Sequence, residues 1–122
     1  MLKRLILAAA FCLAGGAATG GEADVVGVEV RKSGDGSYGF DVTVAHGDEG
    51  WDHYADAWDV VAPDGTVLGT RILAHPHENE QPFTRSLGGV AIPEGITEVT
   101  LRAKDSVHDY GGAEMTVSLP AE

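Results

Sequence analysis

The sequence predicts an all-β domain in which about seven antiparallel strands form a two-sheet sandwich. Three observations support this prediction. Apolar and polar residues alternate with a period of two, as in strands that bury one face. Turn-forming residues recur about every 8–12 positions, an interval suited to short strands. No stretch of residues 24–120 sustains an apolar face at the helical period of about 3.6.

Two strands are expected before the first histidine. Alternating valines predict a half-buried strand at residues 26–31. The turn at residues 33–36 follows, and its glycines and aspartate tolerate positive φ. Residues 38–45 alternate most regularly of all and end at His46. The second strand is therefore the best defined in the chain.

The middle of the chain predicts a hairpin. Residues 63–65 (Pro-Asp-Gly) are a strong turn signal, because proline presets φ and Asp-Gly supplies the reversal. This turn joins the expected strand 54–61, which carries Trp58, to the expected strand 66–73. A polar, glycine-rich loop at residues 46–54 precedes the hairpin.

The last three strands are expected at residues 83–87, 99–104 and 114–119. A corner at residues 93–95 (Pro-Glu-Gly) separates the first two. Residues 105–112 form a long hairpin loop between the last two. Residues 24–120 are thus expected to form a single β-sandwich domain.

The order of these strands resembles known sandwiches. The hairpin that carries Trp58, and the pair of strands flanking residues 105–112, are similar to strands C, C′, F and G of immunoglobulin-like and fibronectin type III-like domains. The resemblance implies a fold of that type, although the inter-sheet cysteines of antibody domains are absent. Residues 75–86 (HPHENEQPFTRS) are also similar to segments of small uncharacterised exported bacterial proteins, a likeness that implies no function.

Residues 1–20 are expected to be a secretory signal peptide. A basic start precedes the apolar run 5–14, and small residues follow. A membrane anchor would need about 20 apolar residues. The mature protein is therefore expected to be periplasmic or secreted, without a membrane span. Cleavage is left open among three positions, after Ala18, Gly20 or Ala23.

The mature chain is expected to be acidic and free of cysteine. Cys12 follows Phe11, where a lipoprotein acylation motif needs a small residue, so it should be lost with the signal peptide. Lys3 and Arg4 are lost too, which leaves six basic against 19 acidic residues and a net charge of −13. Such a surface disfavours nucleic acid and favours cations or basic partners. Solubility outside the cell is the simpler reason for this charge.

All five histidines fall in three loops that a sandwich of this type brings to one pole. These loops are residues 46–54, 73–82 and 105–112. Imidazole is the commonest side-chain ligand for Zn, Cu and Ni, and carboxylates complete such sites. The carboxylates in the loops include Asp48, Glu49, Asp52, Glu78, Glu80, Asp105 and Asp109. A cation site at this pole is therefore expected.

The pair His75 and His77 suggests its centre. On an extended backbone, residues i and i+2 point the same way, and the intervening Pro76 stiffens the segment. We therefore predict an exported, non-catalytic binding module with a divalent-metal site for Zn or Cu. Its expected ligands are His75 and His77, with His53 or His108 and a carboxylate such as Glu78.

An alternative assigns the histidines a structural role. They can order the loops by hydrogen bonds to carboxylates, with His46 simply ending its strand. The protein is then a structural or assembly domain that docks on another envelope protein. An enzyme is not expected, because Asp105, Ser106 and His108 are too close in one loop to form the serial hydrogen bonds of a hydrolase triad.

Four further side chains are candidate contacts for a ligand or partner. The aromatic ones flank the same loops and can stack on a ligand, although Trp51 is alternatively expected to cover the end of the sandwich. Arg85 is expected to pair with Asp56 or Glu80, since an unpaired buried guanidinium is costly. The four contacts are Trp51, Tyr54, Tyr110 and Arg85.

Overall fold

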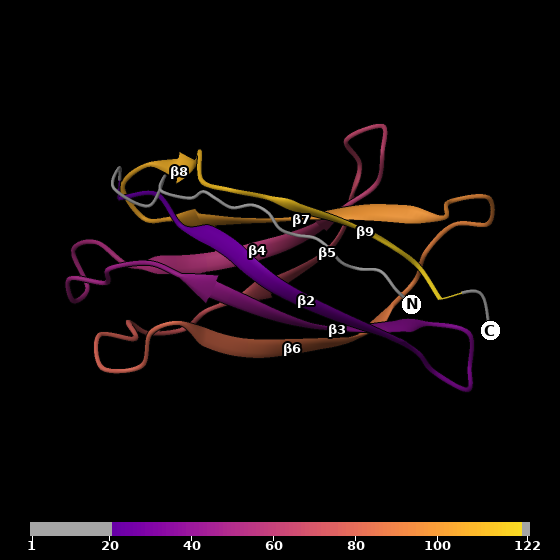
Figure 1. Ribbon diagram of the computed structural model, residues 1–122, viewed down its shortest axis with the longest axis horizontal. Helices are drawn as coiled ribbons and strands as arrows, with labels where there is room; N and C mark the ends of the chain where they lie inside the picture. The colour runs from indigo at the N-terminus through magenta and orange to yellow at the C-terminus, as the bar shows by residue number, and fades with distance from the viewer. Residues whose placement is uncertain (1–20, 121–122) are drawn as a thin grey trace.

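Two antiparallel β-sheets face one another in the computed structural model, which describes residues 21–120 (Figure 1). The predicted all-β, two-sheet sandwich is therefore confirmed. The expected signal peptide at residues 1–20, its cleavage site after Ala18 or Gly20, and Cys12 lie outside the described residues. Within residues 21–120, no helix has the length and apolar character needed to cross a membrane.

The first sheet has three strands in the order β2-β3-β6. They are β2 (Asp24–Lys32), β3 (Tyr38–Ala45) and β6 (Phe83–Val90). The alternation that predicted β3 is visible in its burial, because Phe40, Val42 and Val44 are fully buried while Asp41 and Thr43 are partly exposed. The sheet therefore presents one apolar face to its partner.

The second sheet is built around β4 and β7, in the order β5-β4-β7-β8, with β9 also paired to β7. Its strands are β4 (Ala55–Val61), β5 (Val67–Ile72), β7 (Glu98–Asp105), β8 (Asp109–Tyr110) and β9 (Met115–Ser118). The segment expected as a plain loop at 105–112 thus contains the short strand β8. It pairs with the last two residues of β7, whereas β9 pairs with the first half.

The core lies between the sheets and contains large side chains from both. Phe40 and Phe83 come from the first sheet, and Trp58 and Leu101 from the second; none is more than 1% exposed. Burying four side chains of this size supplies much of the free energy that orders the chain. The core extends just beyond the strands to Ala23, which precedes β2, and Leu73, which follows β5.

The outer face of the second sheet carries a polar network centred on Asp59. This carboxylate is only 3% exposed, and Tyr110 donates a hydrogen bond to it at 2.5 Å. Thr70 donates at 2.8 Å, and the Arg102 guanidinium lies 3.3 Å from Asp59 and 4.1 Å from the centre of the Tyr110 ring. Tyr110 thus has partners within its own sheet, whereas its expected role as a ligand contact stays a prediction.

Tyr110 should titrate later than an ordinary tyrosine. Burial and the hydrogen bond to Asp59 raise its pKa from 10 to about 12. Because the raised pKa favours the neutral phenol in the folded state, its contribution to stability is complete below pH 10 and is lost as the pH rises through 12. Ultraviolet titration should show one tyrosine that ionises at a higher pH than the others, and Tyr110→Phe should remove that transition.

The same substitution should lower the free energy of unfolding at pH 7 by about 1 kcal/mol, the usual cost of one hydrogen bond. Urea unfolding at pH 7 checks this value. Three tyrosines that all titrate near pH 10 would contradict the proposed role of the Asp59 hydrogen bond.

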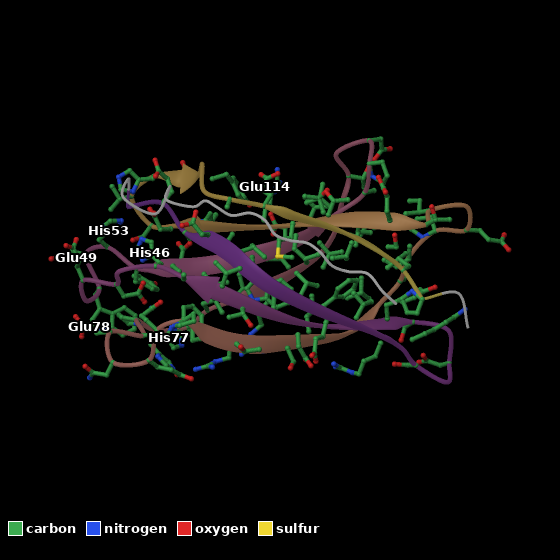
Figure 2. All side chains as sticks on the ribbon, viewed as in Figure 1. His46, Glu49, His53, His77, Glu78 and Glu114 are labelled. Atoms are coloured by element: carbon green, nitrogen blue, oxygen red, sulfur yellow. The ribbon has the colours of Figure 1, made fainter. Side chains whose placement is uncertain are left out.

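Three loops meet at one end of the sandwich, as the strand order predicted. They follow β3, β5 and β7 and gather at the left of the view in Figure 1. Figure 2 shows His46, His53 and His77 at this end, together with Glu49 and Glu78. We call this end the loop pole.

Candidate metal centre

His46 occupies the position directly after β3, with its ring completely buried. Its Nδ1 lies 2.5 Å from a carboxylate oxygen of Asp48, and its Nε2 lies 2.8 Å from the carbonyl oxygen of Gly21. Its backbone N–H donates to the side-chain oxygen of Gln81 at 2.9 Å. These contacts fix the buried ring in one orientation within the loop pole.

His53 comes from the end of the same loop and meets His46 edge to face. The ring centres are 4.7 Å apart, and the two Nε2 atoms are 3.2 Å apart. The Nδ1 atom of His53 lies 2.9 Å from Glu49. This hydrogen bond is the main reason that the pKa of His53 is raised, with a further contribution from Asp105.

Asp105 ends β7 and brings a fully buried carboxylate to the two rings. One oxygen accepts the backbone N–H groups of Val107 and His108 at 2.8 and 2.5 Å. The other lies 3.2 Å from His46 Nε2 and 3.5 Å from His53 Nε2. Burial by itself would raise the pKa of Asp105, but the backbone hydrogen bonds outweigh it and lower the pKa to about 2. Asp105 is therefore a carboxylate at neutral pH.

The three donor atoms form a triangle with the dimensions of a metal site. Its edges are 3.2, 3.2 and 3.5 Å, between the two Nε2 atoms and one carboxylate oxygen. Bonds of about 2.0–2.1 Å in tetrahedral geometry give edges of about 3.3–3.4 Å, whereas octahedral geometry gives about 2.9 Å. Among the described residues, His46, His53 and Asp105 are the group of side chains that can share a cation.

Contacts with the neighbouring carboxylates orient both rings so that their Nε2 atoms face this triangle. A carboxylate only accepts hydrogen bonds, so the partner Nδ1 atoms of His46 and His53 carry the protons and their Nε2 atoms present lone pairs when the rings are neutral. Three acceptors that face one another need a cation or an added proton between them. Carboxylate–imidazole pairs of this kind also orient metal ligands in known sites.

His108 stands beside the triangle. Its Nδ1 lies 3.1 Å from the same Asp105 oxygen, and its ring centre is 4.9 Å from that of His53. Its side chain is 35% exposed, which leaves the ring open to solvent on one side. His108 is thus placed to orient Asp105 or to bind as an additional ligand.

The predicted pair His75 and His77 lies in the neighbouring loop. Their ring centres are 4.8 Å apart. His77 is buried and stacked on Phe83 at 4.0 Å, and burial lowers its pKa. Its Nδ1 has no hydrogen-bond partner among the described residues and lies 3.9 Å from Asp48. This pair is not part of the converging triangle.

The structure therefore brings only part of the predicted ligand set together. His53 and His108 lie around Asp105, as a site at the loop pole requires. His75 and the exposed Glu78 remain on the adjoining loop with His77. Asp48 connects the two groups, because one oxygen contacts His46 while the other accepts the backbone N–H of His77 at 2.6 Å.

Two important residues were missing from that set. His46 is counted among the histidines of the pole and simply ends its strand in the structural alternative, and Asp105 is one of several carboxylates in the loops. The sequence did contain one signal for both residues, the alternation of inward and outward positions along β3 and β7. Positions 40, 42 and 44 point inward in β3, and positions 99, 101 and 103 do so in β7, so His46 and Asp105 are the next inward positions.

The remaining candidate contacts have different surroundings. Trp51 is 67% exposed and packs edge to face against Tyr54 at 5.5 Å, so the expectation that it covers the end of the sandwich is wrong: its ring stays in solvent. Arg85 lies 3.1 Å from Glu80, one of the two expected partners. Asp56, the other, pairs instead with Lys104 at 2.9 Å. Ligand contact by Trp51, Tyr54 or Arg85 stays a prediction.

Comparison with known proteins finds one informative similarity. The chain is 45% identical over 96 residues to a protein of Halomicrobium mukohataei named "Putative lipoprotein". The match covers 79% of this chain and 47% of the relative, so the chain spans about half the length of that protein. No family model matches the chain. No solved structure matches it either.

Proposed function

We propose that this protein is an exported binding module that holds one divalent metal ion between His46, His53 and Asp105. The main observation in support of this proposal is the triangle of donor atoms, with edges of 3.2–3.5 Å, at a buried point where three loops meet. Its second support is the pair of carboxylates that hold the imidazoles in the ligating orientation. The protein acts by binding, without catalysis.

Zinc is the ion that fits this donor set best. Two imidazole nitrogens and one carboxylate oxygen at tetrahedral spacing match its preferences, and Cu²⁺ is the main competitor. Ca²⁺ and Mg²⁺ instead need six or more oxygen ligands, or several retained waters. His108 would hold Asp105 in place from outside the triangle.

The proposed fold type and location have separate support. The sheets β2-β3-β6 and β5-β4-β7, with the last strand beyond β7, have the order of the A-B-E and C′-C-F-G sheets of fibronectin type III domains. The name of the relative, a putative lipoprotein, supports export to the cell envelope. Both agree with an exported fibronectin type III-like module, periplasmic or secreted.

The alternative function is a structural or assembly domain in which the histidines only order the loops. Its support is that each imidazole of the cluster already has a carboxylate partner: His46 with Asp48, His53 with Glu49, and His108 with Asp105. If His46 carries protons on both nitrogens, the network closes without a metal ion. Metal titration separates the two functions.

Titration of metal-free protein with Co²⁺ tests the proposed site. One equivalent should produce the strong visible absorption of tetrahedral Co²⁺, because the donor triangle has tetrahedral spacing, and Zn²⁺ should abolish it. Asp105→Asn should weaken the band, whereas Glu78→Gln, in the neighbouring loop, should leave it unchanged. A spectrum like that of aqueous Co²⁺ would refute the site.

A further inference from the structure

The first described residues lie directly against the candidate metal centre. The carbonyl oxygen of Gly21 is 2.8 Å from His46 Nε2, one corner of the donor triangle. A Cβ on Gly21 would come 3.3 Å from Cε1 of His108 and 3.6 Å from Cε1 of His53. The backbone of Gly21 also has φ of +85°, which favours glycine. The absence of a side chain lets this segment approach the imidazoles closely.

The residues after Gly21 are held by the turn that precedes β9. Asp24 accepts the backbone N–H of Ala113 at 2.7 Å, and Val25 donates to the Ala113 carbonyl at 2.8 Å. A Cβ on Gly112 would come 2.0 Å from the Ala23 carbonyl oxygen, so the two backbones are in direct contact. Residues 23–25 are thus anchored in the sandwich, and they present Gly21 to the metal centre.

The Gly21 oxygen carries lone pairs that can bind a cation, as do the three atoms of the triangle. A carbonyl oxygen is an acceptor, and when the His46 ring is neutral, its hydrogen bond to Asp48 leaves the lone pair on the facing Nε2. Two lone pairs at 2.8 Å repel unless a cation or a proton lies between them. Asp105 brings a third acceptor to within 3.2 Å of the same nitrogen. A cation would satisfy all of them at once.

We propose that the backbone carbonyl oxygen of Gly21 is the fourth ligand of the metal ion, an inference that rests on the proposed metal-binding function. The distance from the Gly21 oxygen to His46 Nε2, 2.8 Å, is about 0.5 Å shorter than the tetrahedral spacing of about 3.3 Å. The metal then joins the N-terminal segment 21–24 to the loop after β3 and to the end of β7. Metal occupancy therefore decides whether Gly21 and Glu22, which precede the anchored residues 23–25, are fixed to the loop pole.

Gly21→Ala and Gly36→Ala are a matched pair of test variants. Both glycines have positive φ, +85° and +90°, so alanine strains both backbones alike. Only the alanine at position 21 meets the imidazoles, because nothing lies within 4 Å of a Cβ on Gly36. We expect Gly21→Ala to lower the affinity for Zn²⁺ about tenfold or more, as loss of a ligand or its support does. Gly36→Ala should bind like the unaltered protein.

Hydrogen exchange of the unaltered protein supplies an independent measurement. Adding Zn²⁺ should slow exchange of the Glu22 amide, because this residue lies between the anchored residues 23–25 and the ligand Gly21. If Zn²⁺ binds but the Glu22 amide exchanges at the same rate with and without it, and Gly21→Ala binds like Gly36→Ala, the Gly21 proposal is wrong while the metal site stands. If the unaltered protein does not bind Zn²⁺, both proposals are wrong.

Discussion

Replacing His46 by glutamine is expected to lower the affinity of the protein for Zn²⁺ by at least about 100-fold. Loss of a second-sphere partner alone costs about 10–100-fold, and His46 supplies one of the three converging atoms that we propose as ligands. Glutamine is polar and of similar size, so the fold should survive. Competition with a chromophoric chelator measures the affinity, and circular dichroism checks that the variant is folded.

His75→Gln is the matched control for this variant. It makes the same chemical change at an exposed histidine of the same loop pole, outside the donor triangle. Its affinity for Zn²⁺ should equal that of the unaltered protein. The ligand set predicted from sequence requires the opposite order, with His75→Gln impaired and His46→Gln intact. That result would move the site to the loop after β5.

Replacing Trp58 by alanine is expected to lower the free energy of unfolding by about 3–5 kcal/mol, the usual effect of removing a buried tryptophan. Trp58 is fully buried in β4, which pairs with strands on both sides. Since a domain of this size is stable by only about 5–15 kcal/mol, the loss is a large part of the total. Urea unfolding followed by circular dichroism measures it.

Trp51→Ala is the control for the core variant. Trp51 is 67% exposed and lies in the loop after β3, so its replacement should change the free energy of unfolding by no more than about 0.5 kcal/mol. Equal losses for the two tryptophan variants would contradict this expectation and would mean that Trp51 is buried in solution.

The fold was largely predictable because its signals are local. The alternation in residues 38–45 identifies β3, and the Pro-Asp-Gly turn at 63–65 identifies the β4–β5 hairpin. Both depend only on neighbours in sequence. The short strand β8 was not predicted, because it is defined by its pairing with the end of β7, whereas β9 pairs with the first half of β7.

The candidate metal centre was only partly predictable because its proposed ligands come from different sheets. The spacing of His75 and His77 is visible in the sequence, but the packing of His77 on Phe83 is a tertiary contact. His46 directly follows β3 of the first sheet and Asp105 ends β7 of the second, so only the packing of the two sheets brings His46 Nε2 to 3.2 Å from the Asp105 carboxylate. Their inward positions in the alternation were the one local indication.

The N-terminal contact was not predictable at all. Gly21 ends a glycine-rich stretch that the sequence assigns to the signal peptide or its cleavage region. Nothing in that stretch indicates a carbonyl oxygen at 2.8 Å from His46. Every residue has a backbone carbonyl, so residue type could not mark this one as a candidate ligand, and only the three-dimensional arrangement shows its contact with His46.

Isothermal titration of the metal-free protein with Zn²⁺ tests the metal site most directly. The structure predicts one bound ion per chain with a Kd below about 100 µM, a weak affinity on the general scale. Titration with Cu²⁺ should fill the same site. Absence of any Zn²⁺ binding tighter than about 100 µM would contradict the site. The histidines of the loop pole would then serve only to order its loops.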